Sequence, residues 1–199
     1  RRNQPTARSL THDRKKGQPL SPDSPDPLLT ALGIMNRDGT VRASMRAKLT
    51  QVNEFIRLVA PLVVERARGD RTLRILDCGC GSAYLTFALY RHLRETCRVE
   101  IEALGIDINQ ELVGKCRGIQ AGLGWPGPTF EAGRISEYVT AASPDVVLSL
   151  HACDTATDEA LALGIRNGSP ILVAAPCCQH ELHGHLVSAL DVRPQVDLR

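Results

Sequence analysis

Residues Ile75 to Tyr84 read Ile-Leu-Asp-Cys-Gly-Cys-Gly-Ser-Ala-Tyr. An apolar run typical of a buried β-strand leads into two glycines separated by one residue, and then into a stretch with the apolar periodicity of a helix. Gly79 and Gly81 lack a Cβ, so their backbone can take unusual dihedral angles and let a ligand come close. A strand, a glycine turn and a helix in this order are typical of a nucleotide-binding site at the end of a parallel sheet.

Two carboxylates accompany the glycine turn. Asp77 lies just before it, and Asp107 ends the next apolar run, Val99 to Ile106. A dinucleotide-binding turn has a third glycine near the position of Tyr84 and an acid about 20 residues further on, whereas Asp107 follows Gly81 by 26 residues. A cofactor without a pyrophosphate does not need the third glycine, and an acid at the end of the second strand can still bind both ribose hydroxyls. We therefore expect S-adenosylmethionine rather than NAD, bound by Asp77, Gly79, Gly81 and Asp107.

The composition is that of one globular domain. The chain has 199 residues, of which 43% are hydrophobic, enough for a single core. It has no apolar run of the roughly 18 residues that a membrane span needs, and its first residues lack the apolar segment of a signal peptide. The seven cysteines are odd in number and lie mostly within or beside expected strands, without the loop spacing of a disulfide framework. We therefore expect reduced thiols and a cytoplasmic protein.

The positive charge of the chain is concentrated at its start. The formal net charge is only +2, but the first sixteen residues hold six basic side chains against one acid, Asp13. The run from Pro22 to Pro27 contains three prolines, so no helix or central strand can extend across it. We interpret residues 1–27 as a basic, proline-rich arm or linker, followed by one domain over residues 28–199. Such an arm is either a solvated terminus or an element that contacts phosphates.

Helix and strand patterns alternate through the rest of the chain. Apolar residues recur every three or four positions from Met45 to Val63, which predicts an amphipathic helix that Gly69 and Asp70 close. The later strands are near-continuous apolar runs, such as Ile171 to Ala175, as expected for strands buried on both faces. The fold class is therefore α/β, with a doubly wound, Rossmann-like and mostly parallel sheet. The expected strands are 73–78, 99–107, 128–132, 145–150 and 170–175, and the expected helices are 83–95, 110–123, 135–141, 157–166 and 182–190.

Polar residues follow the third and fourth expected strands, at the edge of the sheet where ligands of open α/β folds bind. Arg134 and Ile135 come after the third strand, where the adenine of the cofactor would lie; Arg134 is alternatively a surface cation beside Glu131 and Glu137. After the fourth strand, residues 150–158 read Leu-His-Ala-Cys-Asp-Thr-Ala-Thr-Asp. We expect this run to act on the substrate, and either Asp154 or Thr157 is alternatively an ordinary helix N-cap. The candidate catalytic residues of this run are His151 and Asp154.

The fifth expected strand ends in Pro-Cys-Cys-Gln-His-Glu over residues 176–181. His180 or Glu181 could orient or deprotonate an acceptor hydroxyl. His180 is therefore the third candidate catalytic residue.

The two cysteines of this run allow other chemistries. A thiolate nucleophile would serve C5 methylation of a pyrimidine, but the fourth strand lacks the Pro-Cys pair that such enzymes place there. Zinc is the other alternative, yet adjacent cysteines do not have the spacing of zinc ligands. At least one of the two thiols is expected to be buried and inert, and we expect no metal site from Cys177, Cys178, His180, His183 and His185.

The three motifs together resemble a branch of the class I S-adenosylmethionine-dependent methyltransferases that includes the methyltransferase-like 25 group and its bacterial relatives. They are Asp-Cys-Gly-Cys-Gly-Ser-Ala-Tyr-Leu at 77–85, the run at 150–158, and Pro-Cys-Cys-Gln-His at 176–180. The resemblance covers residues 45–182 and includes Lys48 and Gln51, which match a Lys-x-x-Gln of the branch and are implied to close over the cofactor. More distantly, the chain is similar to tRNA 2′-O-methyltransferases with a Cys-Cys-His motif, although Gln179 here separates the second cysteine from the histidine.

This resemblance implies methyl transfer to RNA, with tRNA as the candidate substrate and a ribose hydroxyl favoured as acceptor. Enzymes that methylate base amines usually follow the fourth strand with Asn or Asp, two prolines and an aromatic residue, and this chain has His-Ala-Cys-Asp there instead. The alternatives are a protein methyltransferase and a non-catalytic scaffold that binds S-adenosylmethionine. The methyltransferase sheet has one or two strands more than the five expected here, so we expect its last strands to lie beyond this sequence.

Overall fold

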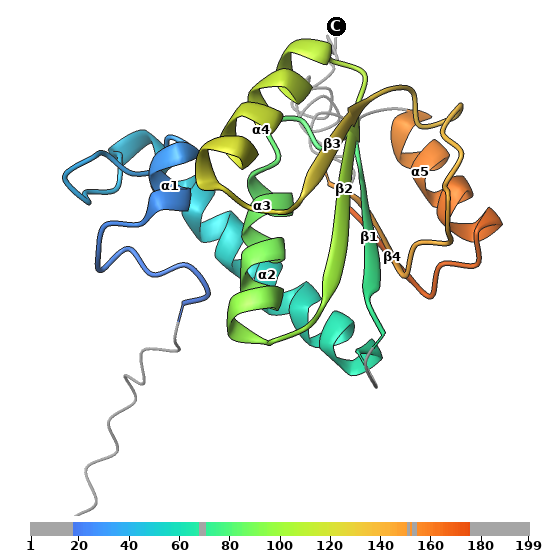
Figure 1. Cartoon of the computed structure of the whole chain (residues 1–199), viewed down its shortest axis with the longest axis horizontal. Coiled ribbons are helices and arrows are strands. Elements are labelled where there is room, and N and C mark those ends of the chain that lie inside the picture. The colour runs from blue at the N-terminus through green and yellow to red at the C-terminus, as the bar shows by residue number, and fades with distance from the viewer. Residues whose placement is uncertain (1–17, 68–70, 151, 153–154, 176–199) are drawn as a thin grey trace, which may run out of the picture.

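A five-stranded sheet with the strand order β3-β2-β1-β4-β5 forms the centre of the molecule (Figure 1). The computed structural model describes residues 18–67, 71–150, 152 and 155–175. All four pairs of adjacent strands are parallel, as the apolar runs predict. The chain leaves β1 toward β2 and β3, and then crosses back to β4, so the two halves of the sheet meet between β1 and β4. The strands are β1 Leu73–Cys78, β2 Ile101–Asp107, β3 Thr129–Ala132, β4 Val146–Ser149 and β5 Ile171–Ala174.

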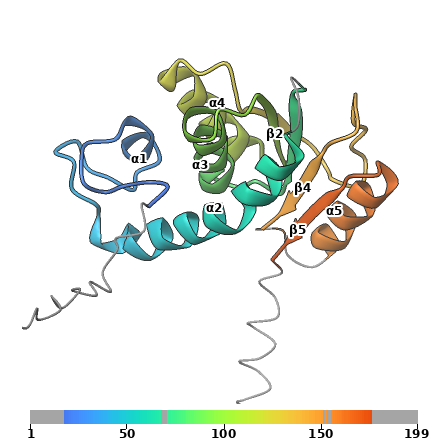
Figure 2. The same cartoon turned by 90° about the horizontal axis from the view of Figure 1, so that it is seen from below.

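Helices cover both faces of this sheet (Figure 2). On one face, α3 and α4 pack against β2, and α2 packs against α3. On the other face, α5 packs against β4, β5 and β1. The helices are α1 Pro27–Ala31, α2 Arg46–Arg66, α3 Tyr84–Arg91, α4 Gln110–Leu123 and α5 Thr155–Arg166, with a short 3-10 turn over Ala43–Met45 and π-helical turns over His92–Thr96. None of the helices in the described part of the chain is long and apolar enough to cross a membrane.

The segment before α2 belongs to the core of the domain. Leu20 is fully buried, and its backbone N–H and C=O both bond to the side-chain amide of Asn53 on α2, at 2.8 and 3.1 Å. Asp26 caps α1 by accepting a hydrogen bond from the N–H of Leu29 and binds Arg91 of α3 through both carboxylate oxygens. Residues 18–26 are thus neither helical nor stranded, in agreement with their prolines, but they are fastened to α2 and α3.

The sequence-based elements agree with the structure except after β3. The predicted helix over residues 135–141 is wrong: the chain makes one turn, in which the N–H of Tyr138 bonds to the carbonyl of Ile135, and then continues irregularly. Ile135 is buried and Tyr138 packs partly against the same cluster, but Val139, next in the chain, is 86% exposed, so the apolar contact of this stretch with the sheet ends after one turn. The branched residues Ile135, Val139 and Thr140 also lower the helix propensity. The predicted helix over 182–190 lies outside the described residues.

Candidate functional site

The glycine turn after β1 has the geometry that the sequence predicts. Gly79 and Gly81 have positive φ angles of 72° and 55°, a region that favours glycine. The N–H groups of Gly79 and Cys80 both donate to the carbonyl of Ile106 at the end of β2, at 2.8 and 3.0 Å. A Cβ on Gly79 would lie 3.2 Å from the Cβ of Ala152, so a side chain larger than hydrogen is crowded there. The turn is therefore fixed between the end of β2 and the residues that follow β4.

Asp107 ends β2 and holds the same turn from the side. One carboxylate oxygen accepts the N–H of Gly81 at 2.8 Å, and the other accepts the N–H of Asn109 at 2.8 Å. A carboxylate oxygen can accept two hydrogen bonds, so Asp107 keeps acceptor capacity for a ribose hydroxyl. The two bonds orient the carboxylate before any ligand arrives.

Asp77 is buried at the carboxyl end of β1, with 4% of its surface exposed. Burial raises the pKa of this carboxyl to about 6 because a charged form is poorly solvated there; a hydrogen bond from the hydroxyl of Thr86 lowers the pKa and the nearby Asp107 raises it. The sequence reasoning missed Thr86, which comes nine residues after Asp77 in the first turn of α3. A hydroxyl side chain in the first turn of the helix that follows the glycines is the signal that could have identified Thr86.

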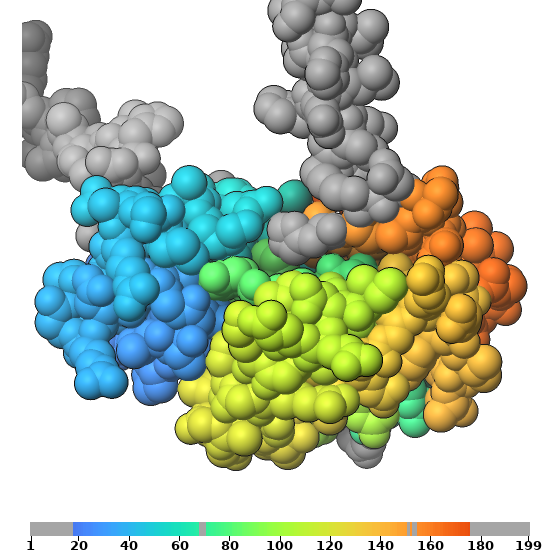
Figure 3. All heavy atoms as spheres, turned by 90° about the horizontal axis from the view of Figure 1, so that it is seen from above, coloured from blue at the N-terminus to red at the C-terminus, as the bar shows by residue number. Residues whose placement is uncertain are grey.

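Lys48 and Gln51 of α2 lie beside the start of α3. The Nζ of Lys48 is 5.8 Å from the centre of the Tyr84 ring, a cation–π distance, and donates a hydrogen bond to Oε1 of Gln51 at 2.9 Å. Tyr84 is the first residue of α3 and follows Gly81 by three positions. Figure 3 looks onto the carboxyl ends of the strands and shows green atoms between the cyan atoms of α2 and the yellow-green atoms of α4. The implied pair of α2 is therefore near the glycine turn, and its contact with cofactor stays a prediction.

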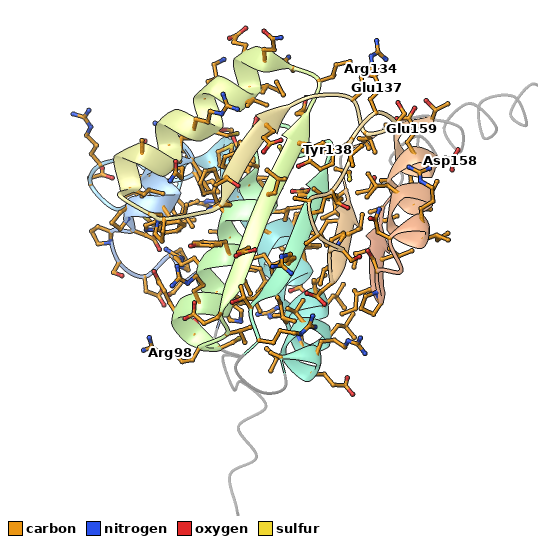
Figure 4. The ribbon with its side chains drawn as sticks, turned by 45° about the vertical axis from the view of Figure 1, so that its right-hand side comes forward. Arg98, Arg134, Glu137, Tyr138, Asp158 and Glu159 are labelled. Atoms are coloured by element: carbon orange, nitrogen blue, oxygen red, sulfur yellow. The ribbon has the colours of Figure 1, made fainter. Side chains whose placement is uncertain are left out.

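The two residues predicted to lie beside the adenine, Arg134 and Ile135, differ in how far they are exposed to solvent. Arg134 is 63% exposed, and its Nε is 3.9 Å from a carboxylate oxygen of Glu137, which agrees with the surface-cation alternative. Ile135 is buried in a core cluster with residues of β1, β2, β4 and α5. Figure 4 shows Arg134 and Glu137 at the same end of the molecule as Asp158 of α5. Their role in binding adenine stays a prediction.

The substrate side of the site is only partly described. His151, Asp154 and His180, the candidate catalytic residues, lie outside the described residues, as do Cys177 and Cys178. Thr157 is inside α5 rather than before it, and its hydroxyl donates to the carbonyl of Ala152 at 2.7 Å, so the alternative of Thr157 as an N-cap is wrong. Within the described ranges, no three His, Cys, Asp or Glu side chains are grouped to hold a metal ion.

A cavity of about 740 Å³ lies elsewhere, beside the amino-terminal halves of β1 and β2. Its lining includes Arg74, Glu102 and Tyr138, and none of the residues of the glycine turn. Parallel sheets bind ligands at the carboxyl ends of their strands, so we assign the cofactor to the turn and not to this cavity.

Comparison with known proteins places this fold in a family. Residues 47–185 match the family model described as "Methyltransferase domain", so the chain belongs to that methyltransferase-domain family. A search of curated proteins finds no match.

Solved structures with the same fold include methyltransferases. Magnesium protoporphyrin IX methyltransferase from Synechocystis with bound S-adenosylhomocysteine is 20% identical, with a TM-score of 0.50 over 80% of this chain and 71% of that one. S-adenosylmethionine-dependent methyltransferases from Thiobacillus denitrificans and Geobacter sulfurreducens, both with S-adenosylhomocysteine, are 23% and 24% identical, each with a TM-score of 0.42 over 57% of this chain. This chain spans 46% and 45% of the length of the latter two.

Proposed function

We propose that this methyltransferase domain transfers the methyl group of S-adenosylmethionine to RNA, with a ribose hydroxyl as the favoured acceptor. The observation that carries the donor assignment is the glycine turn, whose Gly81 N–H is bound by the carboxylate of Asp107. Sulfonium donors lack a pyrophosphate, so this turn needs no third glycine. The structures of similar fold that contain S-adenosylhomocysteine support the same donor.

The described residues supply binding and orientation. S-adenosylmethionine, when bound, supplies a methyl group on a positively charged sulfur that an acceptor oxygen can attack in line. Gly79 and Gly81 let the cofactor come close to the backbone. Asp107 accepts hydrogen bonds from the ribose hydroxyls, and Asp77 adds a buried carboxylate beside them. Methyl transfer needs little covalent help, so positioning and exclusion of water provide most of the rate. In this proposal, His151, Asp154 and His180 orient or deprotonate the acceptor hydroxyl.

The RNA assignment is supported by the charge at the start of the chain and by the resemblance to tRNA 2′-O-methyltransferases. Six basic side chains in the first sixteen residues suit a polyanion. The run after β4 lacks the two prolines and the aromatic residue of base-amine enzymes, which favours a hydroxyl acceptor.

Two measurements test the proposal. Calorimetry of the full chain should detect binding of S-adenosylmethionine or S-adenosylhomocysteine, and absence of binding would reject the donor assignment. Incubation with methyl-labelled S-adenosylmethionine and either total RNA or total protein should label the RNA. Label in the protein fraction would instead identify a protein methyltransferase, and binding without label in either fraction would identify a scaffold.

A further inference from the structure

Thr86 brings a hydroxyl into a buried and mostly apolar stretch of α3. Residues 85–90 read Leu-Thr-Phe-Ala-Leu-Tyr, and all six are buried, with 2% of Thr86 exposed. Valine has nearly the same shape as threonine, so packing alone does not require the hydroxyl. Burying a hydroxyl costs free energy unless it is hydrogen-bonded, so the role of Thr86 depends on its hydrogen-bond partner.

That partner is a carboxylate and not a carbonyl of the same helix. A threonine hydroxyl within a helix often bonds to the carbonyl three or four residues earlier, as the hydroxyl of Thr50 does to the carbonyl of Arg46 on α2. The hydroxyl of Thr86 instead donates to Oδ2 of Asp77, at the end of β1. The bond therefore acts on the carboxylate beside the glycine turn.

This bond leaves Asp77 able to bind a cation. It uses one carboxylate oxygen, and each carboxylate oxygen can accept two hydrogen bonds. The residue opposite Asp77 on β2 is Gly105, which adds no side chain there. Asp107, at the end of the same strand, is close enough to raise the pKa of Asp77, and two neighbouring carboxylates favour a positive ligand. The proposed donor carries two positive groups, a sulfonium and an ammonium, and S-adenosylhomocysteine keeps the ammonium.

We propose that Thr86 is a positioning residue of the cofactor site, which holds the carboxylate of Asp77 ready for the ammonium group of S-adenosylmethionine and thereby sets the lowest pH at which the cofactor binds. This inference rests on the proposed function. Asp77 binds a cation in its ionised form. Burial raises the pKa of Asp77 to about 6, and the hydrogen bond from Thr86 opposes this by stabilising the ionised form. Without the hydroxyl, the carboxyl takes up its proton at a higher pH.

The other titratable or charged groups near Asp77, among the described residues, are present with or without this hydroxyl. Asp107 adds negative charge from β2, and from α2 the ammonium of Lys48 lies over the ring of Tyr84, in the same helical turn as Thr86. Burial raises the pKa values of three nearby thiols, so they are neutral at about pH 8 and below. They are Cys78, Cys80 and Cys116. A change at position 86 alone therefore isolates the effect of the hydroxyl.

The pH dependence of ligand affinity tests this role. Calorimetry measures the binding of S-adenosylhomocysteine to the full chain between about pH 5 and about pH 8. The affinity of the wild type should fall as the pH is lowered through about 6. For Thr86→Val the fall should begin about 1 pH unit higher, because a hydrogen bond to a charged group is worth a factor of about ten. The two affinities should therefore differ about tenfold near the acid end and converge toward the basic end.

Three controls locate the effect at Asp77. Thr140→Val removes a hydroxyl that donates to Asn167 at 2.7 Å, and it should change neither the affinity nor the pH profile. 5′-Methylthioadenosine keeps the adenosine part of the cofactor but has no ammonium group, so Thr86→Val should bind it as the wild type does at every pH. In Asp77→Asn, which has no carboxyl to titrate, the addition of Thr86→Val should not shift the pH profile further.

The outcomes separate this inference from the proposed function. If the wild type binds neither S-adenosylmethionine nor S-adenosylhomocysteine, the cofactor assignment and the role of Thr86 both fail. If the wild type binds and Thr86→Val has the same affinity at every pH, the role of Thr86 is rejected while the cofactor site stands. A loss in Thr86→Val that is equal at every pH, or that extends equally to 5′-methylthioadenosine, identifies a structural role and also rejects the inference.

A second pair of variants covers the case in which Thr86→Val shows no cooperative unfolding in urea. Thr86→Ser and Thr86→Ala differ only in the hydroxyl. The serine variant should bind S-adenosylhomocysteine with the pH profile of the wild type, and the alanine variant should lose affinity at a higher pH. Equal profiles for these two variants would reject the role of the hydroxyl.

Discussion

The hydroxyl of Thr86 donates a hydrogen bond to the carboxylate of Asp77, and both residues are almost completely buried, with 2% and 4% of their surface exposed. The bond joins the carboxyl end of β1 to the first turn of α3, which lie on either side of the glycine turn in the sequence. Among the described residues, this side-chain hydrogen bond partly offsets the free-energy cost of burying the carboxylate of Asp77. The pair therefore links the geometry of the turn to the protonation of Asp77.

Replacement of Asp77 by Asn should change how stability depends on pH. The folded pKa of Asp77 is raised from 3.8 to about 6, so the folded protein holds this proton more tightly than the unfolded chain does. The resulting stabilisation is present below pH 3.8 and is lost as the pH rises to about 6. The unfolding free energy of the wild type minus that of Asp77→Asn should thus fall by on the order of 3 kcal/mol across this window.

Urea unfolding followed by circular dichroism at a series of pH values measures this difference. Thr86→Val removes the bond that lowers the pKa, so it should extend the window to higher pH. A difference that does not vary with pH would show that Asp77 titrates in its ordinary range.

The glycine turn offers a comparison in which backbone strain is held constant. Gly81 and Gly124 both have positive φ angles, 55° and 66°, and a Cβ on either would meet nothing within 4 Å. Alanine at either position should therefore lower the unfolding free energy by about 1 kcal/mol. Only Gly81→Ala should weaken S-adenosylhomocysteine binding, by about tenfold or more, because only its Cβ meets the ligand. Equal calorimetric affinities for the two variants would remove the turn from the cofactor site.

The part of the fold that the sequence predicts well is the part where local pattern and burial agree. β1 and α4 have the bounds expected from their apolar patterns. Asn109, whose side chain accepts the N–H groups of Glu111 and Leu112, marks the start of α4 in sequence as well as in structure. The two glycines and Asp107 could be placed because a turn at the end of a parallel sheet admits few other arrangements.

Long-range contacts explain where prediction from sequence failed. No periodic pattern shows that Asn53 binds the backbone of Leu20 or that Asp26 binds Arg91, since each pair depends on how separate segments meet. The predicted helix after β3 failed for a local reason instead. Its residues contain a short apolar pattern, but the contacts of Ile135 and Tyr138 within a single hydrogen-bonded turn do not offset the cost of helix nucleation.

The cysteines around the glycine turn should be chemically inert in the folded protein. Burial, with a smaller contribution from Asp77, raises the pKa of Cys78 to about 12, and burial together with Asp107 and Asp77 raises that of Cys116 to about 11. Because the thiolate is the reactive form, iodoacetamide at neutral pH should leave both residues, and the buried Cys80, unmodified until the chain is unfolded. Peptide mass spectrometry of native and urea-treated samples measures this directly. Rapid alkylation of Cys78 in the native protein would contradict the buried environment.

The bond between Asp26 and Arg91 should be worth more than the other ion pairs on this domain. Both side chains are only 15% exposed, both carboxylate oxygens take part, and Asp26 also caps α1. Asp26→Ala should therefore lower the unfolding free energy by about 2 to 4 kcal/mol, since it leaves a largely buried guanidinium without its partner and removes a cap. The pair of Arg74 and Glu102 is 45% and 64% exposed, so Glu102→Gln is the matched control and should cost about 1 kcal/mol or less. Equal losses in urea unfolding would show that the segment before α2 is held by its buried leucines and not by this bond.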